Sequence, residues 1–73
     1  MKVHIEYCEK WNYYPDFVRV ANSIEKFAST VIINSNTSPP RSGAFEVTIN
    51  NILIFSKLKT KKFPTETEIR KWF

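Results

Sequence analysis

Residues 2–7 alternate between polar and apolar side chains. The apolar positions, which fall on one face, are Val3, Ile5 and Tyr7. A period of two is typical of a strand that buries one of its faces. We therefore expect a first strand that ends at Cys8.

From Phe17 the apolar residues recur every three or four positions, which predicts an amphipathic helix. Its apolar stripe consists of Phe17, Val20, Ala21, Ile24, Phe27, Ala28 and Val31. Pro15 has no backbone N–H to donate, and its φ suits a first helical turn. The helix is therefore predicted to begin near Pro15, with Asn12 or Tyr14 as its cap.

The next elements are three short strands. The β-branched run at 31–33 precedes a polar stretch with two prolines at 34–40, which predicts a second, central strand followed by a loop. Residues 44–50 alternate again, and Asn50 and Asn51 predict a tight turn into the apolar run 52–55, because asparagine tolerates positive φ. We expect an antiparallel hairpin here.

A second helix is predicted at the end of the chain. Thr65 and Glu68 have the spacing of a capping box, and the glutamates suit the positive end of the helix dipole. The resulting order, β-α-β-β-β-α, favours an α/β fold, namely a two-layer sandwich with a mixed four-stranded sheet. The first strand, helix and second strand should form a right-handed parallel crossover. No repeat or linker interrupts residues 1–73, so we expect a single domain.

Composition narrows the chemistry. One cysteine and one histidine can form neither an intrachain disulfide nor a four-ligand zinc site, so we expect no metal and no resident cofactor. Glu6 and Glu9 interrupt any apolar signal segment, and no apolar run approaches the length of a membrane span. We expect a cytoplasmic protein without a membrane anchor.

The net charge is +4, and much of the excess lies in one lysine run: Lys57, Lys59, Lys61 and Lys62. Such a run can contact phosphates. Alternate lysines at the end of a strand and in the following loop also keep a sheet edge soluble and discourage strand addition. We favour this second interpretation and do not expect nucleic-acid binding.

Three segments together resemble the selenoprotein W (Rdx) family, which includes selenoproteins T and H and the migration and invasion enhancer protein. Residues 3–8 resemble the family's first strand and the start of its redox loop. Residues 43–47 resemble its third strand, and residues 53–58 followed by 63–64 resemble its fourth strand and the start of its last helix. The resemblance covers nearly the whole chain and implies a minimal thioredoxin-like fold.

In this family the first strand ends in a cysteine, two further residues, and a second cysteine or a selenocysteine. Cys8 takes the first of these positions, and Trp11 occupies the second, so the chain departs from the pattern there. The resemblance implies a thiol redox protein that works with one cysteine. The selenocysteine codon differs from the tryptophan codon at one base, so the codon at position 11 decides whether Trp11 is genuine or replaces selenocysteine.

Cys8 is expected between a strand end and a helix N-terminus, where free N–H groups and the helix dipole favour a thiolate. Lys10 supports the negative charge and Glu9 opposes it. A thiolate can form a mixed disulfide with glutathione, as a co-substrate, or with a partner protein. Its release needs an external thiol, so any oxidoreductase activity is expected to be weak. Alternatively, Cys8 is a small buried apolar residue.

A second functional hypothesis is a redox-inactive module that binds a protein partner. Trp11, Tyr13 and Tyr14 would form its contact surface, although Trp11 can also serve as a lid over the helix start. Ser42 and Gly43, in the loop before the third strand, are expected beside Cys8. Gly43, the only glycine, should provide positive φ or a close backbone approach.

Overall fold

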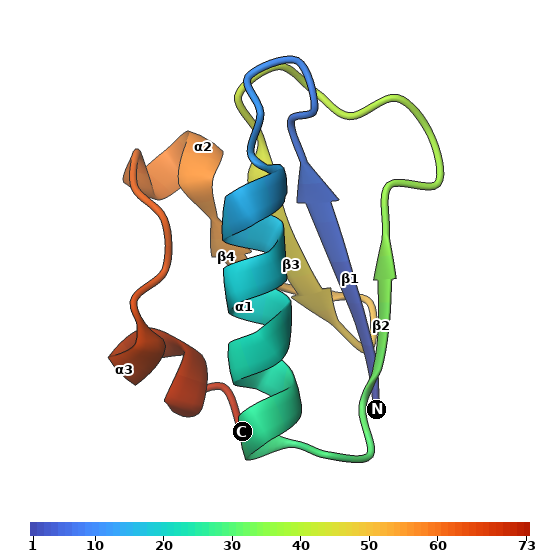
Figure 1. The fold of residues 1–73 in the computed structure, drawn as a ribbon, viewed down its shortest axis with the longest axis vertical. Coiled ribbons are helices and arrows are strands. Elements are labelled where there is room, and N and C mark those ends of the chain that lie inside the picture. The colour runs from blue at the N-terminus through green and yellow to red at the C-terminus, as the bar shows by residue number, and fades with distance from the viewer.

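A four-stranded sheet with helices packed on one face forms from residues 1–73 in the computed structural model (Figure 1). The elements in chain order are β1 (Lys2–Tyr7), α1 (Tyr14–Phe27), β2 (Ile32–Ser35), β3 (Phe45–Ile49), β4 (Ile52–Ser56), α2 (Lys57–Thr60) and α3 (Glu66–Arg70). This confirms the predicted α/β order, to which the structure adds the short helix α2. No helix in the structure combines the length and the apolar character that crossing a membrane requires.

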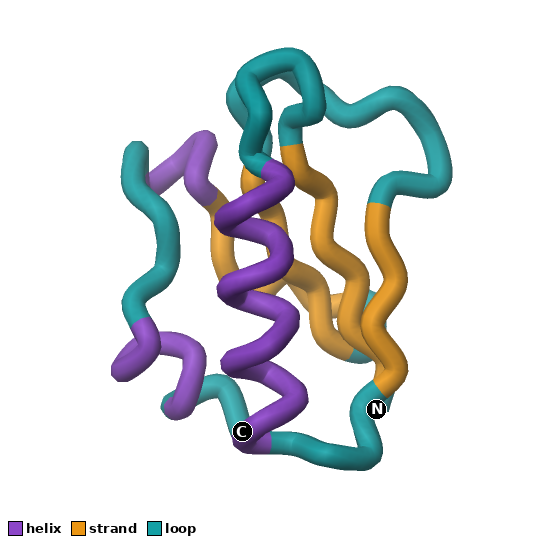
Figure 2. The backbone as a smooth tube through the Cα atoms, viewed as in Figure 1, coloured by secondary structure: helices purple, strands orange, loops and turns teal.

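The strands lie in the order β2-β1-β3-β4 (Figure 2). Strand β1 pairs in parallel with β2 and antiparallel with β3, and β3 pairs antiparallel with β4. The sheet is therefore mixed, as predicted, and α1 forms the crossover between its two parallel strands. The predicted central position of the second strand was wrong, because β2 is an edge strand. Its two apolar residues, Ile32 and Ile33, do not suffice to bury both faces, and Ile32 is 56% exposed.

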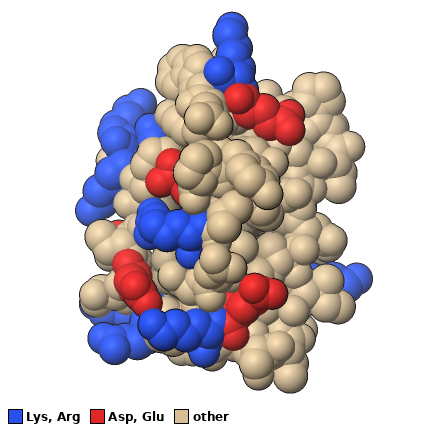
Figure 3. Space-filling model, viewed as in Figure 1, with Lys and Arg blue, Asp and Glu red and all other residues tan.

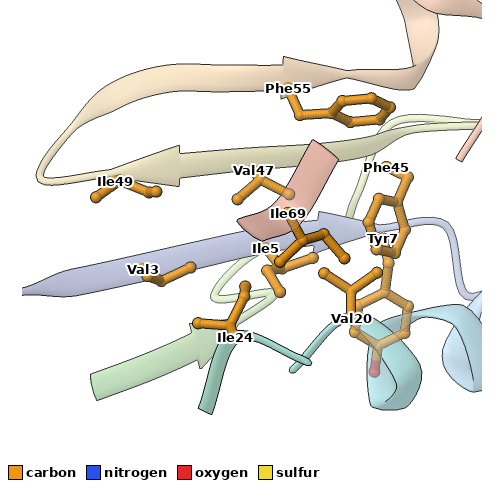
Figure 4. Close-up of a cluster of buried hydrophobic side chains, with 10 residues drawn as sticks. All are labelled: Val3, Ile5, Tyr7, Val20, Ile24, Phe45, Val47, Ile49, Phe55 and Ile69. Atoms are coloured by element: carbon orange, nitrogen blue, oxygen red, sulfur yellow. The ribbon is translucent and has the colours of Figure 1, made fainter. Parts of the chain in front are cut away.

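The core lies between the sheet and the helices (Figure 4). Its ten buried residues are Val3, Ile5, Tyr7, Val20, Ile24, Phe45, Val47, Ile49, Phe55 and Ile69. The strand members follow the period of two, since side chains that point to one face alternate along a strand. Ile69 attaches the single-turn helix α3 to this core.

Helix α1 begins one residue before Pro15, as its first-turn chemistry predicts, but its cap differs from the prediction. Tyr13 is the N-cap, and its side chain makes no capping hydrogen bond. Asn12 instead adopts a positive φ of 57° in the preceding turn. The helix ends at Phe27. The last two residues of the predicted apolar stripe, Ala28 and Val31, therefore lie in the connection to β2.

The predicted hairpin turn at Asn50 and Asn51 and the predicted helix cap at Thr65 are both confirmed. Asn50 and Asn51 have φ values of 50° and 68°, which is the backbone of a two-residue hairpin turn. Thr65 caps α3, because its hydroxyl accepts from the Glu68 N–H at 3.2 Å, while the Glu68 carboxylate accepts from the Thr65 N–H at 2.9 Å.

Half of the lysine run lies in a loop as predicted, since Lys61 and Lys62 follow α2, whereas Lys57 and Lys59 belong to this helix and not to a strand end. Ser56 caps the helix α2 by accepting a hydrogen bond from the Lys59 N–H, and Lys61 ends it in a left-handed conformation. The Lys57 ammonium lies 5.3 Å from the ring centroid of Tyr13 and 5.2 Å from that of Phe63. Lys57 therefore covers an aromatic pair through cation–π contacts.

Candidate functional site around Cys8

Cys8 follows the last residue of β1, where the loop to α1 approaches the loop that leads into β3 (Figure 1). Its N–H donates to the Ala44 carbonyl at 2.9 Å, and its own carbonyl accepts from the Tyr13 N–H at 3.1 Å. The backbone of Cys8 is thus bonded both to the residue before β3 and to the N-cap of α1.

The Cys8 side chain is buried. The residue is 2% exposed, and no hydrogen bond to its sulfur is present. This geometry agrees with the interpretation of Cys8 as a small apolar residue. Reaction of the sulfur with another molecule requires the surrounding loop to move.

The side chain of Trp11 lies against Gly43. Gly43 has a φ of +72°, and a Cβ on it would lie 3.0 Å from the Cζ3 atom of Trp11. Both predicted roles of Gly43, positive φ and close approach, are therefore present. Trp11 also meets the edge of the Tyr13 ring, at a centroid distance of 6.2 Å, yet it remains 57% exposed.

The two tyrosines that follow have different environments. Tyr13 is half-buried and meets the ring of Phe63 edge-on at 4.8 Å. Tyr14 is 54% exposed and lies 6.0 Å from Tyr7 between ring centroids. The exposed aromatic residues of this region are therefore Trp11 and Tyr14, while Tyr13 is a packing residue.

Lys10 and Ser42 are exposed and make no side-chain hydrogen bond or ion pair. Ser42 precedes Gly43, so it lies in the loop that contacts Trp11. Lys10 lies in the turn between Cys8 and Asn12 that the Asn12 N–H closes by donating to Glu9 at 3.0 Å.

A cluster of charged residues near this end of the sheet is not evident from the sequence. Glu6 and Glu46 are cross-strand partners, and Arg41 lies between loop and sheet. The Arg41 guanidinium donates to Glu6 at 2.8 and 3.2 Å, the Arg41 N–H donates to it at 2.8 Å, and Glu46 lies 3.8 Å from the guanidinium. The hydrogen bonds from the Arg41 side chain hold the pKa of Glu6 below its usual value, against the effect of burial.

The same loop is tied to β1 at a second point. The Asn36 side chain accepts from the Tyr7 N–H at 3.0 Å and donates to the Tyr7 carbonyl at 2.9 Å. Glu46, which is 5% exposed, accepts hydrogen bonds from the Ser56 hydroxyl and the Leu58 N–H. Contacts at Asn36 and Arg41 thus fasten both ends of the segment before Gly43.

No group of three or more histidine, cysteine, aspartate or glutamate residues in the structure is arranged to hold a metal ion. The region contains one thiol, two exposed aromatic rings and the charged cluster.

The chain matches the family model described as Rdx family over residues 2–72. It is 30% identical over 69 residues to migration and invasion enhancer 1 of Bos taurus, a match that covers 94% of this chain and 58% of that protein. It is 33% identical over 58 residues to selenoprotein W of Danio rerio, with 78% of this chain and 67% of that protein covered. The chain thus spans little more than half the length of the Bos taurus relative.

A solved structure, that of a selenoprotein W-related protein from Vibrio cholerae, superposes with a TM-score of 0.83 at 18% identity and covers 96% of this chain and 88% of that one. A structure from Bordetella parapertussis gives the same TM-score at 15% identity, with 96% and 89% covered. These structures establish the fold. The family match over residues 2–72 shows that the chain belongs to the Rdx family, whose thioredoxin-like architecture it has.

Proposed function

We propose that this protein is a thiol redox protein in which Cys8 forms a mixed disulfide with glutathione or with a protein partner. Membership of the Rdx family suggests a thiol redox role. The observation that supports the assignment to Cys8 is its position: the only cysteine follows β1 directly and bonds through its carbonyl to the N-cap of α1. We propose a cytoplasmic location, where glutathione is available and an unpaired cysteine stays reduced.

The proposed reaction is thiol–disulfide exchange. The Cys8 thiol gives its proton to water, and the thiolate attacks one sulfur of glutathione disulfide. A bond forms between Cys8 and that sulfur, the original S–S bond breaks, and one glutathione leaves as a thiolate. A second glutathione thiolate reverses the step, because Trp11 offers no sulfur or selenium that can attack the mixed disulfide.

Burial of the sulfur sets a condition on this reaction. The loop from Cys8 to Tyr13 is closed by two backbone hydrogen bonds, at 3.1 and 3.0 Å, and by the contact of Trp11 with Gly43. We propose that opening of this loop precedes attack. The rate of modification then depends on the opening equilibrium as well as on the chemistry of the thiol.

Intact-mass measurement after incubation with glutathione disulfide tests the proposal. The folded protein should gain the mass of one glutathione, lose it on addition of reduced glutathione, and gain none as Cys8→Ser. Modification that occurs only in denaturant would contradict a redox role for the folded protein.

A second candidate function is protein binding through Trp11 and Tyr14, which their exposures of 57% and 54% favour. Under this proposal a partner is captured as well by Cys8→Ser as by the unchanged protein, whereas the double variant Trp11→Ala, Tyr14→Ala captures none. Loss of capture in Cys8→Ser under non-reducing conditions would instead support the mixed disulfide.

A further inference from the structure

Strand β4 forms one edge of the sheet, at the opposite end of the strand order from β2. It pairs with β3 and has no neighbour on its other side. The backbone groups of residues 52–55 take part in no hydrogen bond outside the sheet. Such an edge presents N–H and C=O groups to which an extended peptide can add as a further strand.

The exposed side chains of β4 are aliphatic. Ile52, Leu53 and Ile54 are 65%, 52% and 40% exposed, and the strand has no charged residue. The pairing register with β3 shifts at Ile54, which leaves this residue without a direct cross-strand partner. Leu53 and Ile54 both line one groove, so this part of the edge offers apolar surface of the kind that marks a binding site.

A groove of about 530 Å³ adjoins this edge and is lined by residues of β4, α2 and the end of α3. Its apolar lining comes from Leu53, Ile54, Phe55 and Trp72. The ring centroids of Phe55 and Trp72 are 6.0 Å apart. Lys59 and Lys71 also line it. A bound strand therefore meets apolar surface and cationic groups within the same groove.

The charge around the groove is mostly positive, although Glu68 lies close enough to offset part of the charge of Lys62 and Lys71. Lys59 and Lys71 form no ion pair, and the same is true of Lys61 and Lys62. The one acidic residue of the lining, Glu68, is held by the capping box of α3. Figure 3 shows basic side chains gathered along the side of the molecule where α2 lies.

This charge distinguishes between possible occupants. A second copy of the chain, paired edge to edge, would bring its own unpaired lysines against this groove, and like charges oppose that contact. An acidic peptide would neutralise them. The lysines lie outside β4 itself, so they leave its backbone edge accessible.

We propose that β4 and the adjoining groove bind an extended peptide of alternating apolar and acidic residues, which adds to the sheet as a fifth strand. Because strand side chains alternate between the two faces of a sheet, one set of the peptide's side chains can enter the groove beside Trp72, Lys59 and Lys71, while the other set lies on the opposite face. This interaction is separate from the chemistry of Cys8.

The probe is a short fluorescein-labelled peptide of alternating valine and glutamate. We expect its anisotropy to rise with protein concentration and the affinity to fall with added salt. In amide spectra of the isotopically labelled protein, signals of residues 52–55 should shift and exchange more slowly with solvent. A control peptide with lysine in place of glutamate should not bind.

Three surface variants and one control variant locate the site. Lys59→Glu and Lys71→Glu should each weaken peptide binding by about fivefold, the size expected for loss of one exposed charge contact. Lys2→Glu carries the same change of net charge on the exposed start of β1 and should bind as the unchanged protein does. Ile54→Lys, which places a charge on the edge, should abolish binding while preserving the circular dichroism of the fold.

Several results would overturn the proposal. One is the absence of binding, and another is an equal loss in Lys2→Glu, which would indicate unspecific charge attraction. Amide shifts confined to other elements would also contradict it. Sedimentation that shows a dimer of the protein alone, abolished by Ile54→Lys, would assign the edge to a second copy instead.

Discussion

The indole ring of Trp11 lies so close to Gly43 that a Cβ at position 43 would stand 3.0 Å from its Cζ3 atom. This contact joins the loop after β1 to the loop before β3. The backbone hydrogen bond between Cys8 and Ala44 connects the same two segments. The order of the loop that buries Cys8 therefore depends on a glycine more than thirty residues further along the chain.

We predict that Gly43→Ala destabilises the fold by about 1–3 kcal/mol, because alanine is strained at this positive φ and its methyl group meets the indole. Urea unfolding measures the change. In a Trp11→Ala background the same substitution should cost less, since only the backbone strain remains. An equal cost in both backgrounds would show that the indole contact contributes nothing.

The same contact predicts an effect on thiol access. Trp11→Ala should accelerate the reaction of Cys8 with glutathione disulfide, because the loop loses the contact that holds it against Gly43. The measurement is the rate of adduct formation by mass spectrometry. Tyr14→Ala is the matched control, since Tyr14 is equally exposed but contacts Tyr7 and Phe17 instead. An unchanged rate in Trp11→Ala would show that other motions expose the sulfur.

The ion pair of Glu6 with Arg41 predicts a pH dependence of stability. The pKa of Glu6 is lowered in the folded protein by hydrogen bonds from the Arg41 side chain, so folding favours the charged form. Its contribution is present above the pKa of the unfolded chain and is lost as the pH falls through the folded value. We therefore expect the free energy of unfolding to decline from near pH 4.5 downward.

Glu6→Gln should flatten part of that decline and lower the stability at neutral pH. Glu25→Gln, which alters an exposed glutamate without an ion pair, is the control and should leave the profile unchanged. Urea unfolding at a series of pH values provides the data. Identical profiles for the two variants would exclude Glu6 as the source.

Ile69 predicts how strongly α3 is held. It is fully buried among core residues of the sheet and α1, and Ile69→Ala should cost about 2–5 kcal/mol. A chain of this size has little stability to spare, so the variant should be largely unfolded at body temperature. Thr67→Ala, an exposed change on the same helix, should have a small effect. Thermal unfolding followed by circular dichroism distinguishes the two.

Local patterns predict most of the fold, because alternation, helical spacing and turn residues act over a few positions. The strand β1, the Asn50–Asn51 turn and the Thr65 capping box were predicted in this way and are confirmed. The edge position of β2 was missed because strand order depends on pairing between distant segments. Helix α2 was missed because lysine spacing alone does not reveal that Ser56 acts as its cap.

The site was predicted less completely, for a related reason. Position along the chain placed Cys8 at the end of a strand and Gly43 near its loop. Burial of the sulfur, however, results from how two loops close over it, and the contacts of Arg41 join residues 35 positions apart in sequence. Neither has a signature within a short window.

Burial of the Cys8 sulfur has a consequence for the reversibility of its oxidation. A mixed disulfide is bulkier than a thiol, so the folded protein must give up packing to accommodate one, and the energy lost favours the reduced state. If Cys8 forms the mixed disulfide proposed above, this linkage gives the adduct a higher reduction potential than an adduct on an exposed cysteine, so glutathione removes it more readily. The packing of the folded protein would then favour return of Cys8 to the free thiol once the oxidant has been removed.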